Sequence, residues 1–244
     1  MTAPARSNAR CGARRQGARC LLGTAALALA CAAHAQFAGT LALASSNRYR
    51  GMGTGDAGPV IRASVMADLP VGAYGGVSGL WRTRDASLAS AEGMVGWSGR
   101  VDALPPEWGW DAALHRAHYE AAGARDFTEV MLGVLGPGFT LRSWYSPHYF
   151  GGYTHVFYTE LNASRAIGER WHAFGHLGRL HYGPAADYQE RTPDRTDTLV
   201  GIALTLSRWD VQLARDGILA GHARSGLDAR ARRPAWIASA SIAF

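Results

Sequence analysis

From residue 36 onward the sequence is a succession of short runs in which apolar and polar residues alternate. No window of 18 consecutive apolar residues occurs, so the sequence predicts no membrane-spanning helix. Alternation with a period of two is typical of β-strands, and about 9–11 residues suffice for a tilted strand to cross a bilayer. The pattern predicts twelve strands: Ala38–Ser45, Pro59–Ala67, Gly72–Trp81, Glu92–Asp102, Glu107–Tyr119, Asp126–Leu135, Phe139–Ser146, Tyr153–Arg165, Trp171–Tyr182, Arg195–Ser207, Trp209–Asp216 and Pro234–Phe244.

The last of these runs has one face without a polar residue. Trp236 and Phe244 bound this face, and Ala238, Ala240 and Ile242 lie between them. An apolar face bounded by aromatic residues fits a strand of a transmembrane barrel, although a strand of a soluble sandwich would alternate in the same way. The run also resembles the closing strand of bacterial outer-membrane barrels, which implies that Phe244 is a signal for the barrel-assembly machinery.

The connections between the predicted strands alternate in length. The odd-numbered ones are long: Ser46–Gly58, Arg82–Ala91, Glu120–Arg125, Pro147–Gly152, Gly183–Asp194 and Gly217–Arg233. The even-numbered ones are short: Asp68–Val71, Ala103–Pro106, Gly136–Gly138, Ala166–Arg170 and Arg208. Long external loops and short periplasmic turns are typical of outer-membrane barrels, and an even number of strands returns the chain to the side where it started.

Residues 1–35 have the pattern of a cleaved secretory signal peptide. Five arginines without an acidic residue precede or flank the start of the apolar run Leu21–Ala30, and Ala33–Ala35 forms a cleavage site. Cleavage would leave residues 36–244 as a single barrel domain without cysteine, and would lower the formal charge from +6 to 20 − 19 = +1. This charge gives no reason to expect nucleic-acid binding. A lipid anchor on Cys31 is the competing interpretation, and the residues before it fit the lipoprotein motif poorly.

Several charged residues fall on rows that we assign to the inside of the barrel. Arg142 lies between Glu129 and Glu160 on three neighbouring strands, so these side chains could form an acid–arginine–acid ladder. The ladder would be either a constriction that selects solutes by charge or a structural network that stiffens the wall, and the second interpretation is favoured. The candidate lumen and constriction residues are Arg62, Arg100, Glu129, Arg142 and Glu160.

Two other groups of residues could carry chemistry. His172 and His176 share one face of a predicted strand, but no third ligand has a suitable spacing, so a place on the lumen wall or in an interfacial girdle is favoured over a metal site. Ser146 and His148 lie together at a strand end, as a lipid hydrolase would need, but no carboxylate or amide is placed to orient the histidine. The sequence therefore predicts neither an enzyme nor a cofactor.

The first predicted connection begins with the stretch Ser45-Ser46-Asn47-Arg48-Tyr49-Arg50-Gly51-Met52. It resembles the opening of the TorF family of proteobacterial outer-membrane porins, which has Ser-Asp-Tyr-x-Phe-Arg-Gly-Ile at this place. Ser45, Tyr49 and the pair Arg50-Gly51 match, whereas positions 46 and 47 depart from the pattern. The resemblance extends mainly over the first hairpin, to Gly72–Gly76, and implies an outer-membrane barrel with a transport function. Arg50 would be either a plug from the first loop or a contact for solutes.

These patterns predict an all-β protein, an antiparallel up-and-down transmembrane β-barrel of twelve strands in the bacterial outer membrane, with both chain termini in the periplasm. We expect a porin or passive channel for small solutes, surrounded by outer-membrane lipid and lipopolysaccharide. The alternatives are a barrel enzyme that acts on lipid, similar to a lipase or deacylase, and a structural barrel with a closed lumen. Twelve strands lie between the eight-stranded barrels that side chains fill and the larger porins with open channels, so the strand number does not decide between them.

Overall fold

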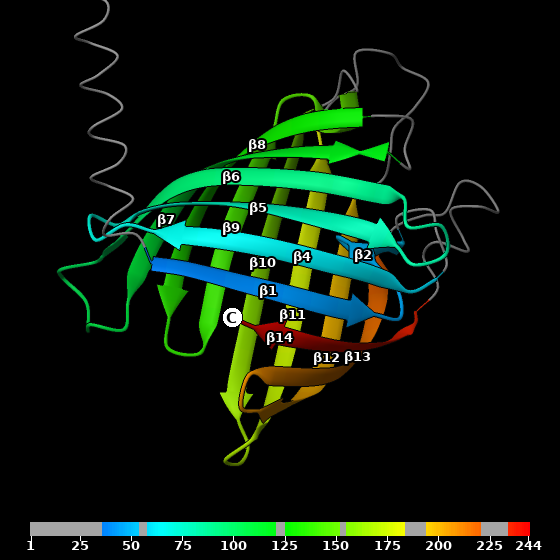
Figure 1. Ribbon diagram of the computed structural model, residues 1–244. Coiled ribbons are helices and arrows are strands. Elements are labelled where there is room, and N and C mark those ends of the chain that lie inside the picture. The colour runs from blue at the N-terminus through cyan, green and yellow to red at the C-terminus, as the bar shows by residue number, and fades with distance from the viewer. Residues whose placement is uncertain (1–35, 54–57, 121–124, 152–154, 184–193, 221–233) are drawn as a thin grey trace, which may run out of the picture.

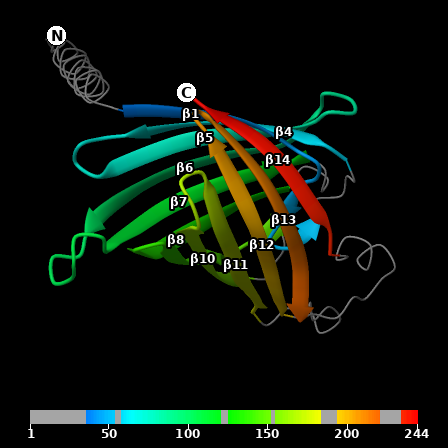
Figure 2. The same cartoon turned by 90° about the horizontal axis from the view of Figure 1, so that it is seen from below.

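The computed structural model of the chain is a closed β-barrel, seen from the side in Figure 1 and from below in Figure 2. It describes residues 36–53, 58–120, 125–151, 155–183, 194–220 and 234–244. The predicted signal peptide and the alternative lipid anchor Cys31 lie outside these residues. Around the barrel the strands follow one another in chain order, and every neighbouring pair is antiparallel.

The strands of the barrel agree with the alternating runs of the sequence. They are β1 (Gln36–Ala44), β4 (Val60–Asp68), β5 (Ala73–Arg82), β6 (Leu88–Arg100), β7 (Gly109–Tyr119), β8 (Arg125–Gly136), β9 (Phe139–Ser146), β10 (Val156–Ala166), β11 (Trp171–Tyr182), β12 (Arg195–Leu206), β13 (Trp209–Ala220) and β14 (Trp236–Ala243). The predicted all-β fold, a closed antiparallel barrel of twelve strands, is confirmed. Two boundaries differ by four residues, since β6 begins at Leu88 rather than Glu92 and β13 ends at Ala220 rather than Asp216.

The barrel closes between its first and last strands. β1 pairs with β4 on one side and with β14 on the other, so the blue and red strands lie side by side in both views (Figures 1 and 2). Five residue pairs, from Thr40–Ala243 to Ala44–Ser239, form this seam, whereas nine pairs join β1 to β4. Beside the seam, Gly39 and Phe244 exchange two backbone hydrogen bonds of 2.8 and 3.0 Å. The predicted pairing of the final strand with the first is therefore confirmed.

The predicted alternation of connection lengths is wrong at β6. We call one end of the barrel the loop end and the opposite end the turn end. The loop end carries the connections that were predicted to be long, namely β1–β4, β5–β6, β7–β8, β9–β10, β11–β12 and β13–β14. The β5–β6 connection spans only residues 83–87, fewer than the β6–β7 turn at residues 101–108. Asp85 accepts hydrogen bonds from the hydroxyl and the backbone N–H of Ser87, at 2.6 and 3.1 Å, and these bonds lower the pKa of Asp85 to about 2. This tight turn allows β6 to begin early.

The outer surface of the barrel is apolar. On β6, Val95 and Trp97 are 62% and 51% exposed, whereas Ser98 lies on the inner face opposite the buried Asp111. Soluble proteins rarely expose so many large apolar side chains, and an apolar exterior with a polar interior is the arrangement of a barrel in lipid. The exposed aliphatic belt includes Leu41, Val65, Val77, Val95, Leu114, Leu132, Leu141, Leu161, Leu177, Val200, Ile202, Val211 and Leu213.

Exposed aromatic residues gather at the two edges of this belt. At the turn end they are Phe37, Trp97, Trp110, Trp171, Trp209 and Phe244, and at the loop end they are Tyr145, Phe157 and Trp236. Tyr145 and Phe157 also pack on each other, with ring centroids 4.8 Å apart. Aromatic girdles at both membrane interfaces are typical of outer-membrane barrels, because the amphipathic rings lie at the level of the lipid headgroups.

Two connections at the loop end fold into the barrel. The first contains the small hairpin β2 (Arg48–Tyr49) and β3 (Met52–Gly53), and the second contains the 3₁₀ helix η2 (Tyr149–Gly151). Tyr49 of the hairpin and Tyr149 and Phe150 of η2 pack against the buried Phe127 of β8. No helix formed by the described residues is long and apolar enough to cross a bilayer. The contacts of Tyr49, Tyr149 and Phe150 with Phe127 join the two inward connections to the barrel wall.

Candidate functional site

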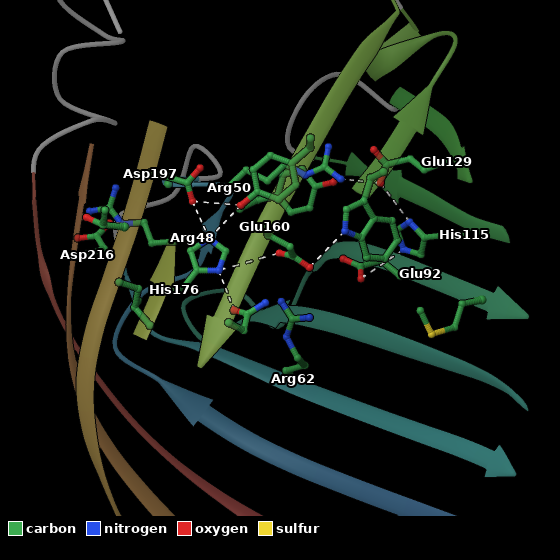
Figure 3. Close-up of a pocket in the computed structure, with 18 residues that line it drawn as sticks. Arg48, Arg50, Arg62, Glu92, His115, Glu129, Glu160, His176, Asp197 and Asp216 are labelled. Atoms are coloured by element: carbon green, nitrogen blue, oxygen red, sulfur yellow. Dashed lines mark hydrogen bonds and ion pairs between the residues drawn. The ribbon is translucent and has the colours of Figure 1, made fainter. Parts of the chain in front are cut away.

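A cavity of about 420 Å³ lies inside the barrel, toward the loop end. Besides the hairpin, it is bounded by ionisable side chains from eight different strands of the wall. Figure 3 shows the ionisable residues that line it, namely Arg48, Arg50, Arg62, Glu92, His115, Glu129, Glu160, His176, Asp197 and Asp216. The hairpin therefore faces ionisable groups from most of the strands of the wall.

A tight turn of the hairpin carries Arg50 into this cavity. Tyr49 pairs with Met52, which leaves Arg50 and Gly51 as the two turn residues. Their φ angles are +49° and +73°, and positive φ at both positions is the requirement of a two-residue type I′ turn. Glycine adopts this conformation without strain, but an arginine does not. Such a backbone persists where the surrounding contacts of the side chain hold it.

Three tyrosine rings and one carboxylate enclose Arg50. Its guanidinium carbon lies 4.8 Å from the ring centroid of Tyr49, 5.4 Å from that of Tyr149 and 4.3 Å from that of Tyr158. Its Nη2 donates a hydrogen bond of 2.8 Å to Oε2 of Glu129, and the two side chains are only 6% and 1% exposed. Burial raises the pKa of Tyr149 to about 12, so this phenol is neutral at neutral pH and offers the cation its ring face.

Glu129 connects this enclosure to a second group of charges on the wall. Nδ1 of His115 lies 3.6 Å from Oε2 of Glu129, and its Nε2 lies 3.7 Å from Oε2 of Glu92. The hydroxyl of Tyr119 donates to the other oxygen of Glu92 at 3.3 Å. His115 therefore bridges carboxylates on the strands to either side of it, β6 and β8.

His176 is the centre of a third group, on β10, β11 and β12. Its Nε2 lies 2.9 Å from both Oδ2 of Asp197 and the hydroxyl of Tyr158, and its Nδ1 lies 2.7 Å from Oδ1 of Asn162. Oε2 of Glu160 is 4.0 Å from the same Nδ1. Because Tyr158 also faces Arg50, this group touches the enclosure from the side opposite His115 (Figure 3).

The hairpin is fastened to the wall on two further sides. Nε of Arg48 lies 2.9 Å from Oδ2 of Asp216 on β13. Nη2 of Arg62 on β4 donates to Oδ1 of Asn47 at 3.3 Å. The backbone of Gly51 approaches Asp197 so closely that a Cβ at this position would collide with that side chain. Contacts from β4, β8, β12 and β13 thus determine where the turn lies.

The predicted ladder of Glu129, Arg142 and Glu160 is wrong. Arg142 instead donates from Nε and Nη2 to Oδ2 of Asp111, at 3.1 and 2.8 Å, and thereby reaches over β8 to β7. Gly133 of β8 lies between them, and a Cβ there would collide with Asp111 and lie 2.9 Å from Cγ of Arg142. The missing side chain at Gly133 leaves room for Arg142 to extend over β8 to Asp111. Alternation along a strand gives the face of each residue but not the direction of a long side chain.

Most of the predicted site residues are nevertheless brought together. Those that line the cavity are Arg62, Glu129, Glu160, Tyr49, Arg50 and Gly51. Arg142 lies beside it in the pair with Asp111, and Arg100 is exposed at the turn end of β6. His176 lines the cavity as the wall residue that the sequence suggested, while His172 lies at the turn end of β11.

Several cavity residues were missed by the sequence reasoning. Glu92, His115, Asp197 and Asp216 lie on the inward rows of β6, β7, β12 and β13, so the alternation alone could have indicated them. Arg48 could not be found in this way, because it reaches the lumen only through the inward fold of its connection. No local pattern in the sequence indicates the direction in which that connection folds.

The residues considered for hydrolysis and metal binding have other surroundings. Ser146 is buried, and its hydroxyl donates a 3.0 Å hydrogen bond to the backbone oxygen of Thr128. His148 is exposed in the following connection. Within the part of the chain that the structure describes, no group of three or more His, Cys, Asp or Glu residues is placed to hold a metal ion.

Comparisons with known proteins agree with this architecture at the level of the fold. No family model matches the sequence, and no curated protein matches it. A solved structure described as "KdgM porin" is similar to this chain with a TM-score of 0.54 and 7% identity, over 85% of this chain and 99% of that one. The chain has a porin fold. A second structure, described as "Unveiling the Mechanism Behind the in-meso Crystallization of Membrane Proteins", has a TM-score of 0.54 and 9% identity over 85% and 83%.

At 7% and 9% identity, these two likenesses concern the fold alone. The narrower resemblance to the TorF family, carried by Tyr49 and Arg50-Gly51, stays a prediction. What the structure adds to it is the place of these residues, which line the cavity at the centre of the charged network.

Proposed function

We propose that the protein is a porin-like channel of the bacterial outer membrane for small solutes, and that the hairpin β2–β3 narrows its lumen. The observation that carries this proposal is a closed barrel with an apolar exterior and a charged cavity of about 420 Å³ inside. An apolar belt between two aromatic girdles is suited to a bilayer, and a polar lumen is suited to hydrated solutes. The porin fold of its structural neighbour supports the same function.

A second cavity supports a route from the site toward the turn end. It has a volume of about 210 Å³ and lies along β4, β5 and β6. It shares Arg62, Glu92, Met94 and His115 with the first cavity, so the two spaces meet at these side chains. Gly93 belongs to its wall, and the nearest atom to a Cβ there would be 4.0 Å away, so the absence of a side chain leaves room. We propose that solutes pass between the hairpin and this side of the barrel.

Single-channel recording in planar bilayers tests the channel. The refolded protein is expected to give conductance steps, and Arg50→Asn is expected to raise them, because asparagine tolerates positive φ but cannot reach Glu129. Arg84→Asn is the matched control, since Arg84 is exposed in the β5–β6 connection outside the cavity, and it should leave the steps unchanged. If neither the unaltered protein nor Arg50→Asn conducts, the channel is refuted and the closed structural barrel is favoured.

We also propose that the protein is not a lipid hydrolase. The Ser146 hydroxyl is engaged with the Thr128 carbonyl, which leaves it poorly placed to give its proton to a base. Purified protein is expected to leave phospholipid and lipid A intact. Hydrolysis that disappears with Ser146→Ala or His148→Ala would contradict this proposal.

The orientation belongs to the same proposal. We propose that the loop end faces the cell exterior, among lipopolysaccharide, and that both chain termini lie in the periplasm. The short β5–β6 connection is the place to test it, since residues 83–87 are exposed or half-buried at the loop end. An epitope inserted there should be labelled on intact cells, and labelling only after the outer membrane is opened would reverse the orientation.

A further inference from the structure

The surroundings of Arg50 have the composition of a site for an organic cation. Three ring faces lie within 5.4 Å of the guanidinium carbon, and a carboxylate accepts a hydrogen bond from it at 2.8 Å. Aromatic faces combined with an acid are how proteins recognise ammonium and guanidinium groups, because the negative ring face attracts a desolvated cation. We call Tyr49, Tyr149, Tyr158 and Glu129 the aromatic–acid box.

Arg50 fills this box incompletely. Only its Nη2 is bonded to Glu129, and only through Oε2. Nη1 of Arg50 and Oε1 of Glu129 are both buried and have no hydrogen-bond partner among the described residues. Guanidinium and carboxylate groups bind most strongly through two parallel hydrogen bonds, a geometry that Arg50 does not reach here and that a free guanidinium could adopt. The box therefore has binding capacity that Arg50 does not use.

The backbone opposes the position that the box imposes on Arg50. The residue holds φ at +49°, a conformation that costs a non-glycine residue free energy. Phe150, next to Tyr149 in η2, also has a positive φ of +50°. Both inward connections that build the box are thus held by their contacts against a local preference. A ligand that replaced the Arg50 side chain would remove the contacts that hold this strained turn in place.

The charge of the cavity favours a cation over an anion. Five carboxylates and three arginines line it, so its formal charge is −2 with the histidines neutral, and it becomes −3 when Arg50 leaves. The two remaining arginines already have partners, since Arg48 is paired with Asp216 and Arg62 donates to Asn47. An anion entering the box would meet Glu129 without a free arginine opposite it.

We infer that the aromatic–acid box is a binding site for solutes that carry a guanidinium or a primary ammonium group, and that Arg50 occupies it as a tethered competitor. A solute cation that takes the place of Arg50 frees the turn of β2–β3 from Glu129 and widens the lumen. The role in transport rests on the proposed channel function, whereas the binding itself does not.

Isothermal titration calorimetry on the refolded protein tests the binding without requiring conductance. The ligands are arginine, lysine, glutamate and citrulline, which has the shape of arginine but an uncharged urea group. In Arg50→Asn the box is empty of its competitor, so arginine is expected to bind at least about tenfold more tightly than to the unaltered protein. Comparison of lysine with arginine shows which cationic group the box prefers. Citrulline and glutamate are expected to bind weakly in both.

Three variants make the result specific. Arg62→Asn removes the same charge from the same cavity without emptying the box, so a gain equal to that of Arg50→Asn would mean simple electrostatics and would overturn the inference. Glu129→Gln in the Arg50→Asn background is expected to abolish the gain. Arg50→Gly, which also suits the positive φ, repeats the test if the asparagine variant folds poorly.

The outcomes separate the two proposals. Arginine binding without conductance would retain the box and refute the channel. Conductance with no preference for arginine over citrulline in Arg50→Asn would retain the channel and refute the box. Tight binding of glutamate in place of arginine would reverse the assigned ligand charge and also refute the inference.

Discussion

Single side chains inside the barrel carry charges that water does not reach. Arg50 and Glu129 are 6% and 1% exposed, so each depends on the other for compensation of its charge. Removing one partner of a buried pair leaves an uncompensated charge, which costs more than the pair contributes when it is intact. At the surface the same chemical change has little effect, because solvent takes over the lost interaction.

Glu129→Gln is therefore expected to lower the free energy of unfolding by about 3 kcal/mol, as breaking a buried ion pair does. Asp126→Asn is the control with the same chemistry, since Asp126 pairs with Arg116 at 2.7 Å but the side chains are 43% and 67% exposed. It should cost less than about 1 kcal/mol. Denaturant titration of the folded barrel, followed by tryptophan fluorescence, measures both. Equal losses would show that Glu129 is compensated by groups other than Arg50.

Gly133→Ala tests the path by which Arg142 reaches Asp111. The added methyl would collide with Asp111 and crowd Arg142, so the variant is expected to lose about 1–3 kcal/mol through overpacking. Gly93→Ala is the matched control, because the nearest atom to a Cβ there is 4.0 Å away. It should be neutral or slightly stabilising. The same denaturant titration separates them, and an unaffected Gly133→Ala would mean that the ion pair shifts without cost.

The same residues show what a sequence can predict at this scale. Glu129, Arg142 and Glu160 were assigned to the correct face, because facing follows from alternation. Their partners were not predictable. Arg142 extends over Gly133 of the neighbouring strand to reach a target two strands away, and Arg50 reaches Glu129 from a connection 79 residues away. Contacts made by long side chains across a lumen leave no local signature.

At the scale of elements, strands were easier to predict than connections. A barrel strand repeats its alternation over many residues, eleven or twelve in several strands, so one residue that departs from the pattern does not hide the strand. The β5–β6 connection depends instead on two hydrogen bonds between Asp85 and Ser87, and its short length was missed for that reason. The inward folds of β2–β3 and η2 depend on distant aromatic contacts, such as the 4.8 Å contact between Phe127 and Phe150.

The prediction that belongs to β14 concerns Phe244. Its ring lies against Gly39, where a Cβ would collide with it, and the side chain is 71% exposed at the turn end. If Phe244 is an assembly signal, Phe244→Ala should lower the amount of folded protein in the outer membrane several-fold. Phe37→Ala is the control, because Phe37 is an aromatic residue at the same end with 66% exposure. Quantification of heat-modifiable protein on gels is the measurement, and equal falls would assign both residues to the girdle alone.

The molecule as a whole depends on the seam between β1 and β14. Gly39 and Phe244 form a hydrogen-bonded pair, so by alternation Ala42 and Ser241 form a non-hydrogen-bonded pair, whose side chains approach closely. Residues 36–244 contain no cysteine, so Ala42→Cys with Ser241→Cys would create the only thiols there. The oxidised double variant is expected to stay closed at temperatures that open the unaltered barrel. Electrophoresis measures the disulfide as a shift in mobility that is lost when reductant is added. Failure of the two thiols to oxidise in the folded state would contradict the register of β1 and β14.

The seam between β1 and β14 is also expected to form late in folding. In every other pair of neighbouring barrel strands, one strand follows the other along the chain, so their contacts join nearby parts of the chain. Thr40 and Ala243 are partners although about 200 residues separate them, and contacts between distant residues form late because closing a long loop must precede them. Until these five pairs form, the chain has two open strand edges that can pair with another molecule. The shortest pairing in the barrel thus determines how long the folding chain remains open to aggregation.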